Sequence, residues 1–539
     1  MACVTPARRV AGREVTTLEG LAPAVRDTWA QAFADTGASQ CGFCTPGIIM
    51  RLAALQASRP TLDEAAVKRA LLAHLCRCTG WRSILEAARR VAGLGAGVQP
   101  GERCEEEKVG PVTRLSANAV ARAVSQRAES GHLHRRAREG GADSSWAKAH
   151  DRDQFSEGRD LDAACARATL EGGLPQRVGP PVALGAGGFA DDTAPGGALV
   201  AVPDGRGGFC VAESLAAARV KAGKVQGRNT TMALRHPLEV ARGDWVLTLR
   251  TTFVEPAYLE PDASWCAPGG EPASPLANGG AFGGKLASPV VEAARSLAEA
   301  HGRAVRVLLA REDVVCLGPK RPPIAAALRE DGSGVMRVAR TPGSADLSGW
   351  AEAVRSALPH VDVEEVEVPG PRVSAELRGA GWAEAAVLAA ALDARRRQRL
   401  GTGIPVTVVS ASKARATAAI GADGAVSVRL SAGEVLDEVV LRAYAVGAVH
   451  QALGWVRSEG VAVADDGEVL DLTMRSFGVI TARDMPPVDV EIEREDVPAV
   501  RGSDAVFAAV AAAAWLAGGL APAWPLEQGC RGSTKGGGI

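Results

Sequence analysis

The chain has 539 residues, more than one hydrophobic core accommodates, so we expect three or four domains. Its 61 basic and 62 acidic residues give a formal net charge of −1, and without a long basic run nucleic acid is not an expected partner. The eleven cysteines are mostly scattered singly, and the N-terminus lacks the apolar core of a secretory signal. These features favour a cytoplasmic protein.

The N-terminal region, residues 13–95, has the pattern of a small helical domain. Apolar residues recur there at helical spacing, and short turns with Gly or Pro separate the helical segments. The expected helices cover 18–33, 47–55, a stretch that begins with the capping box 61–64, and 83–91. We therefore predict a compact antiparallel four-helix bundle.

Four cysteines fall at the predicted helix ends in two close pairs. Cys41 and Cys44 are spaced as C-x2-C, and Cys76 and Cys78 as C-x-C. Four thiolates can surround a [2Fe-2S] core, and a helix that begins at Cys44 directs its positive end toward thiolate. A structural zinc site and unrelated buried cysteines are the alternatives, although zinc loops usually use wider pairs than C-x-C.

The residues around these cysteines resemble a known family. Segments 37–47, GASQCGFCTPG, and 74–81, HLCRCTGW, are similar to the second iron–sulfur domain of the xanthine dehydrogenase family, the molybdenum hydroxylases. The resemblance implies a [2Fe-2S] cluster on the four cysteines that passes electrons away from a molybdopterin cofactor. It also implies that Gln40 and Cys78 lie closest to the pterin.

Residues 1–12 resemble the end of the family's ferredoxin domain, with Cys3 at the place of its last ligand. The three earlier ligands are absent, so we expect Cys3 to be a free surface thiol. Three explanations stay open: the start codon is misplaced, the chain has decayed, or the ferredoxin-like domain lies on a separate subunit. Residues 96–180 are rich in Gly, Arg, Glu, Ser and His, and we expect a loosely ordered linker there.

From residue 181 onward, β-like runs alternate with Ala-rich helical stretches, which predicts an α+β or mixed α/β body. The expected strands are 198–202, 245–253, 305–309, 405–410 and 425–430, and the expected helices are 290–300, 383–394 and 441–453. Residues 505–524 are uncharged and long enough to span a bilayer, but their apolarity is mostly Ala. We prefer a buried helix, and no membrane, for this stretch.

Two segments of the body resemble landmarks of the family's molybdopterin subunit, in the expected order. They are 254–261, VEPAYLEP, and 279–285, GGAFGGK, and RGAG at 378–381 resembles a further loop. Glycines let backbone amides approach an anionic or oxo-metal ligand closely. The resemblance implies molybdopterin-binding-like regions at 181–345 and 346–539, with cofactor contacts at Gln40, Gly279, Gly280, Ala281, Phe282, Gly283, Gly284 and Arg378. A surface salt bridge is the alternative role for Arg378.

The body departs from the family pattern where catalysis is expected. The family uses a Glu in a C-terminal Gly-Glu motif as general base, and we find none. The nearest counterpart is Asp504, for which capping a helix is the preferred role. The stretches after Glu260 and between 410 and 441 are also shorter than in a complete subunit.

Two functions of different classes follow. The first is an oxidoreductase component that hydroxylates a small-molecule substrate, an aldehyde or an N-heterocycle, and that needs an FAD-binding partner subunit. The second is a non-catalytic electron-transfer or degenerate subunit that keeps the cluster. A zinc-stabilised structural protein is a third interpretation.

Overall fold

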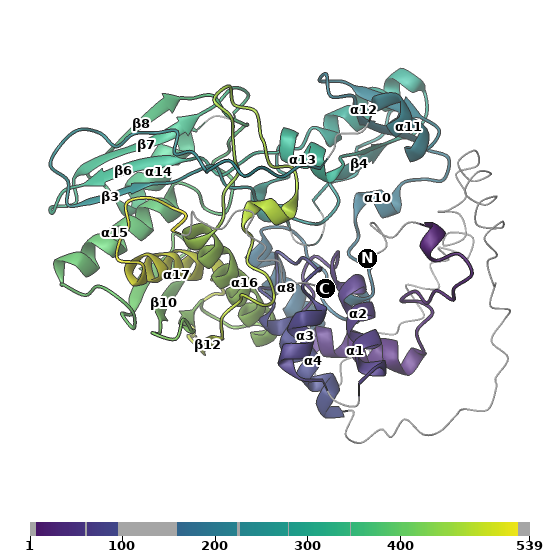
Figure 1. The fold of residues 1–539 in the computed structure, drawn as a ribbon, viewed down its shortest axis with the longest axis horizontal. Coiled ribbons are helices and arrows are strands. Elements are labelled where there is room, and N and C mark those ends of the chain that lie inside the picture. Colours follow the sequence, from purple (N-terminus) through teal and green to yellow (C-terminus); the bar gives the residue numbers. More distant parts are fainter. Residues whose placement is uncertain are drawn as a thin grey trace.

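The computed structural model describes residues 7–59, 62–94, 159–223, 227–276, 278, 280–344 and 347–526. Within these ranges an N-terminal helical bundle packs against a body that contains three four-stranded sheets and several helices (Figure 1). This arrangement confirms the predicted fold class, a four-helix bundle followed by a mixed α/β body. Cys3, Gly279 and most of 96–180 lie outside the described residues.

The bundle has its four helices where the sequence predicts them. They are α1 (Pro23–Asp35), α2 (Thr45–Ala57), α3 (Glu64–Ala70) and α4 (Arg82–Leu94). Asp63 caps α3 by accepting a hydrogen bond from the Ala66 amide at 2.7 Å. Trp29 and Phe33 of α1 are fully buried and meet edge to face at 6.3 Å. The aromatic core therefore holds the bundle together, and its loops are free to position the cysteines.

Part of the predicted linker is a helix, so that prediction is wrong over α8 (Leu161–Gly172). Asp160 caps the helix at the amides of Asp162 and Ala163, and Gly173 ends it in a left-handed conformation. Its buried face carries small residues and an Arg–Glu pair in place of large apolar side chains. Helix α8 has few large apolar residues because an ion pair and small side chains form its buried face, so its low apolar content does not mean that it is loosely ordered.

Two sheets form the upper half of the body (Figure 1). The first has the order β2-β1-β5-β4, in which β1 and β5 are parallel, and α11 and α12 pack on it. The second has the order β3-β6-β7-β8 and carries α14. The bounds are β1 (Leu199–Pro203), β2 (Phe209–Ala212), α11 (Leu215–Ala222), β3 (Leu247–Arg250), β4 (Ala263–Cys266), α12 (Val290–His301), β5 (Val305–Leu308), α13 (Arg311–Leu317), β6 (Ile324–Leu328), β7 (Gly334–Arg340), α14 (Ser348–Ala357) and β8 (Val361–Glu367).

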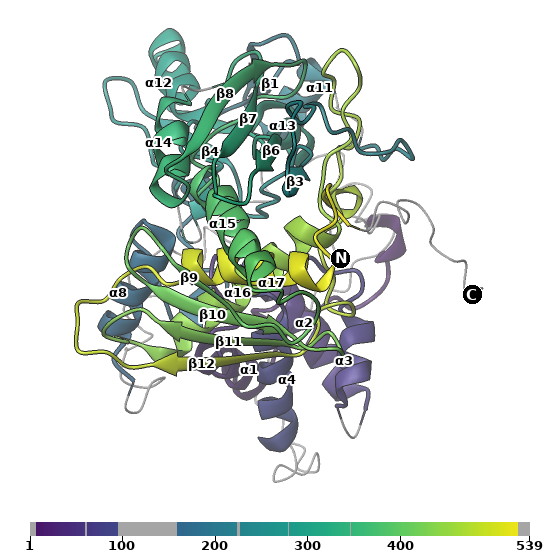
Figure 2. The ribbon, with the colours of Figure 1, turned by 90° about the vertical axis from the view of Figure 1, so that its left-hand side faces the viewer.

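The third sheet, of order β12-β11-β10-β9, supports the central helices of the body. Its buried face is apolar and alternates with exposed positions along each strand. Figure 2 shows α17 lying across this sheet beside α16 and α15. The bounds are α15 (Trp382–Arg396), β9 (Val406–Val409), β10 (Arg415–Ile420), β11 (Val426–Ser431), α16 (Glu438–Arg457), β12 (Val488–Glu493) and α17 (Ser503–Ala517).

The most apolar helices form the core of the body. The stretch of membrane-like composition forms α17, and its side chains from Ala505 to Leu516 are at most 4% exposed. Among the described residues, α16 is the helix whose length and apolarity would suffice to cross a membrane, and 83% of that window is buried inside the protein. Packing against neighbouring helices and a sheet therefore accounts for the apolarity of both helices.

Candidate redox and cofactor site

Loops of the bundle bring the four predicted ligands together. Cys41 and Cys44 end the loop before α2, and Cys76 and Cys78 lie in the loop before α4. Their side chains contact in two pairs, Cys41 with Cys78 and Cys44 with Cys76. Each pair therefore takes one cysteine from each sequence motif.

The chemistry of this thiol quartet fits a [2Fe-2S] cluster. The cysteines in the described part of the chain are free thiols, and Cys41, Cys76 and Cys78 are buried. The hydrogen bond with Cys44 lowers the pKa of Cys76 to about 7, and Thr79 Oγ1 lies 3.0 Å from the same sulfur, whereas hydrogen bonding to a neighbouring thiol and burial raise the pKa of Cys44 and of Cys78. Cys44 is also the N-cap of the thirteen-residue helix α2, whose dipole favours thiolate. Four thiolates from two loops are what such a cluster needs.

A buried carboxylate lies against one of the thiol pairs. The ligand atoms of Cys41, Cys78 and Glu260 lie within 4.8 Å of one another. Lys285 Nζ lies 3.4 Å from Glu260, both side chains are fully buried, and burial raises the pKa of Glu260. The sequence indicated Glu260 only as part of a family landmark. The segment repeats a Glu-Pro pair, at 255–256 and 260–261, and this repeat was the available signal.

The glycine loop turns sharply beside this pair. In the short helix η4 (Gly280–Gly283), Ala281 and Phe282 adopt positive φ values of 52° and 55°. A Cβ at Gly283 would overlap the Glu376 carbonyl oxygen, and Arg378 N–H donates to Phe282 O at 3.1 Å. We expected these glycines to make room for a ligand. At Gly283 the room is filled by the neighbouring loop, so this glycine allows two loops to pack together.

A cavity of about 250 Å³ unites predicted site residues that are far apart in sequence. The predicted residues that line it are Gln40, Phe282, Gly283, Arg378 and Asp504. The Gln40 amide donates to Ala443 O at 3.1 Å, so α16 holds it in place. Because Gln40 precedes Cys41 in the chain, the cavity adjoins the thiol quartet.

Arg378 supplies the free hydrogen-bonding capacity of this cavity. Its Nε and Nη2 atoms are buried without a hydrogen-bond partner among the described residues. The guanidinium lies 5.3 Å from the Phe507 ring and 5.8 Å from the Phe282 ring, and burial lowers the pKa of Arg378 to about 10. Arg378 is therefore not the surface ion pair of the alternative interpretation. It offers N–H donors suited to an anionic group.

Asp504 does not cap α17, so the preferred prediction for this residue is wrong. The amides of Gly502 and Ser503 instead donate to the Glu171 carboxylate, each at 2.9 Å. Glu171 comes from α8 and is paired with Arg167 at 3.2 Å, with both side chains fully buried. Asp504 lies 3.6 Å from Arg501. No local pattern could indicate Glu171, because the cap comes from 331 residues away.

Comparison with known proteins identifies the N-terminal domain. Residues 17–89 match the family described as "[2Fe-2S] binding domain". The chain is 40% identical over 90 residues to a probable xanthine dehydrogenase subunit of Bacillus subtilis, which covers 17% of this chain and 52% of that protein. It is 44% identical over 91 residues to a nicotinate dehydrogenase subunit of Pseudomonas putida. This match covers 17% of this chain and 58% of that protein. The chain thus spans little more than half of these two relatives.

A longer relative matches over a stretch of similar length. The xanthine dehydrogenase of Emericella nidulans is 48% identical over 90 residues, which are 16% of this chain and 6% of that protein. These three relatives therefore each match about a sixth of this chain.

Solved structures show the fold of the whole chain. The aldehyde oxidoreductase from Desulfovibrio gigas superposes with a TM-score of 0.59 and 12% identity, covering 98% of this chain and 93% of that chain. The aldehyde oxidoreductase from Desulfovibrio desulfuricans superposes with a TM-score of 0.53 and 13% identity. This superposition covers 95% of this chain and 91% of that chain. The body therefore shares its fold with these oxidoreductases despite its divergent sequence.

Proposed function

Since the chain carries the [2Fe-2S] domain of the xanthine dehydrogenase family, the molybdenum hydroxylases, on a body with the aldehyde oxidoreductase fold, we propose that it is an oxidoreductase component. Its cluster carries electrons away from a molybdopterin site that acts on an aldehyde or an N-heterocycle. One observation supports this proposal above the others: the thiol quartet adjoins a cavity lined by residues from three distant segments, Gln40, Phe282 and Arg378.

Each residue has a part in this proposal. Cys41, Cys44, Cys76 and Cys78 would hold the cluster, and Gln40, Phe282, Gly283 and Arg378 would contact the pterin. Arg378 fits such a cofactor because its unpartnered buried N–H groups require an acceptor. When bound, the cofactor would supply hydroxylation with oxygen from water. The protein supplies position, charge and exclusion of solvent.

Two carboxylates of the cavity support the second candidate, electron transfer without hydroxylation. Glu171 accepts two backbone N–H groups and pairs with Arg167, while Asp504 pairs with Arg501. A general base needs a carboxylate that is free to take a proton from the reacting group. Glu171 and Asp504 do not meet that requirement, and Glu376, the third carboxylate of the lining, forms no ion pair among the described residues and is the candidate base left to the hydroxylation step.

Partners follow from the same reasoning. The Bacillus subtilis and Pseudomonas putida relatives are named as subunits, and each matches 17% of this chain. We propose that this chain passes its electrons to an FAD-binding subunit and to a ferredoxin-like subunit.

Molybdenum content and substrate-dependent reduction test the proposal. The chain, purified anaerobically from a host that makes the cofactor, is expected to contain molybdenum with its iron, and aldehydes or N-heterocycles should bleach its visible absorption. Iron without molybdenum, and absorption that responds to dithionite but to no substrate, would favour the electron-transfer candidate.

A further inference from the structure

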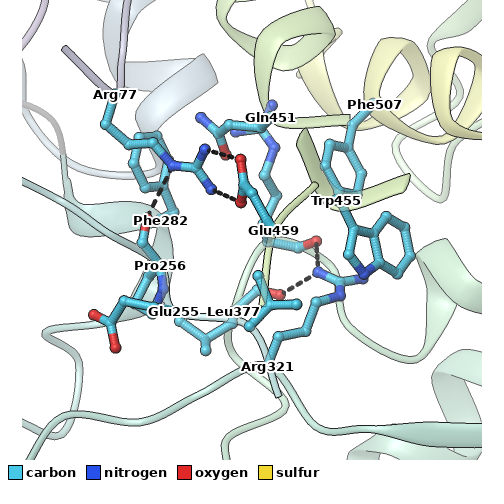
Figure 3. A pocket seen from close by; sticks show the side chains of 12 residues that line it. Arg77, Glu255, Pro256, Phe282, Arg321, Leu377, Gln451, Trp455, Glu459 and Phe507 are labelled. Atoms are coloured by element: carbon cyan, nitrogen blue, oxygen red, sulfur yellow. Dashed lines mark hydrogen bonds and ion pairs between the residues drawn. The ribbon is translucent and has the colours of Figure 1, made fainter. Parts of the chain in front are cut away.

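A buried ion pair ties the cysteine loop to the body. Arg77 stands between Cys76 and Cys78, and its two terminal nitrogens donate to the two carboxylate oxygens of Glu459 at 2.5 and 2.7 Å (Figure 3). The side chains are 5% and 1% exposed. Arg77 Nε donates to the Pro256 carbonyl oxygen at 3.0 Å. The hydrogen bonds that the guanidinium forms with the described residues therefore all come from the body, while the Arg77 backbone belongs to the cluster domain.

The position of the positive charge is set by the C-x-C motif. Arg77 is bonded on both sides to cysteines, so its backbone lies beside two of the thiolates, while Glu459 and Pro256 fix where its guanidinium lies. The compensating negative charge comes from Glu459, just after α16. The net charge beside the cysteine loop therefore depends on the contact with the body.

That contact is close along its whole length. Trp81 Nε1 donates to Ile480 O at 3.1 Å, and Gln40 Nε2 donates to Ala443 O at 3.1 Å. A Cβ at Gly447 of α16 would overlap the Cys78 carbonyl oxygen. The ion pair thus lies in a preformed and water-poor surface, where charges act over longer distances than in water.

We propose that Glu459 is a positioning residue for the cluster: by neutralising Arg77, it keeps the reduction potential low and makes that potential depend on the docked body. The inference rests on the proposed function, because it requires the cluster. One-electron reduction adds a negative charge to the cluster, so an uncompensated Arg77 favours the reduced state. An uncompensated Glu459 disfavours it.

These opposite signs define the variants. Glu459→Gln is expected to raise the midpoint potential and Arg77→Leu to lower it, each by about tenfold in the one-electron reduction equilibrium, or about 59 mV. The double variant R77L/E459L removes both charges and should return close to wild type. A purely structural role predicts no such reversal of sign.

The body contains a matched control. Arg321 Nε lies 2.7 Å from Glu384, with side chains 7% and 1% exposed, and neither residue belongs to the cysteine loop. Glu384→Gln breaks an equally buried pair within the body. Arg321 lines the same small cavity as Arg77 and Glu459 but does not belong to the cysteine loop, so Glu384→Gln should lower the stability as Glu459→Gln does and shift the midpoint potential less.

The test is a redox titration of the full chain followed by EPR, with iron measured in every sample. Opposite shifts in Glu459→Gln and Arg77→Leu, with a smaller shift in Glu384→Gln, are the expected result. An unchanged potential in iron-loaded Glu459→Gln and Arg77→Leu, or the same shift in Glu384→Gln, would overturn the inference alone. If Glu459→Gln fails to fold, Arg77→Leu and the double variant still decide. A wild-type chain without iron would overturn the proposed function as well.

Discussion

At the residue scale, the thiol quartet is the feature that local sequence describes best. The close pairs and their glycine neighbours indicate a cluster site, and the structure places all four side chains in contact as two pairs. The residues that support the quartet are different in kind. Arg77, Glu171, Glu260 and Glu459 act through partners hundreds of residues away, or through burial, and no local spacing reveals such pairs.

Replacement of one cysteine tests the quartet at this scale. Cys78→Ser is expected to reduce iron to near zero and to abolish the visible absorption, because three thiolates and a hydroxyl hold the cluster weakly. Cys210→Ser, in strand β2 of a distant sheet, is the control and should retain full iron. Full iron and an unchanged EPR spectrum in Cys78→Ser would contradict the ligand assignment.

His450 links a single residue to the pH dependence of stability. The ring is fully buried, its Nε2 lies 2.9 Å from Ile480 O, and burial lowers its pKa to about 3. Between pH 6.5 and 3 the unfolded chain binds a proton that the folded chain does not, so stability falls as pH falls, by about 1 kcal/mol per pH unit. His450→Gln should flatten this part of the curve in urea unfolding. An unchanged slope would mean that the imidazole is protonated in the folded protein.

At the scale of elements, the contact between α16 and the cysteine loop depends on a missing side chain. Gly447→Ala would push a methyl group into the Cys78 carbonyl oxygen and is expected to lower the free energy of unfolding by about 2 kcal/mol. Gly47→Ala in α2 is the matched control, because a Cβ there has no atom within 4 Å. It should instead stabilise the helix by up to about 1 kcal/mol. Equal effects in urea unfolding would contradict the close contact.

The first turn of α17 provides a second test. Glu171→Gln removes the charge that pairs with Arg167 and weakens the cap on Gly502 and Ser503, for an expected loss of about 2–4 kcal/mol. Asp504→Asn, at the residue that the sequence suggested as the cap, should cost less than about 0.5 kcal/mol. Urea unfolding measures the free energy of unfolding of both variants. A larger loss in Asp504→Asn than in Glu171→Gln would show that Asp504 is the cap.

The elements that the sequence predicts are those that local apolar patterns stabilise. Strands with alternating apolar residues and long Ala-rich helices lie close to the predicted ranges, as for α12, α15 and α16. Helix α8 was missed because its buried face carries an ion pair and small residues. The cavity was also inaccessible to local reasoning, since it forms only when Gln40, the glycine loop, Arg378 and α17 meet.

At the scale of the whole molecule, the bundle and the body form one connected structure. The bundle contributes the thiol quartet and Gln40, while the body contributes the cavity walls and the compensating charge of Glu459. The family resemblance, which places Gln40 and Cys78 beside the pterin, implied this association. The geometry of the association depends on tertiary contacts that only the structure shows.

The central claim is that the full chain holds one [2Fe-2S] cluster beside this cavity. The most direct measurement is metal content per chain after anaerobic purification, with EPR of the dithionite-reduced protein. We predict two irons per chain and a rhombic spectrum from one unpaired electron on a reduced cluster. Zinc in place of iron, with no EPR signal after reduction, would contradict the account.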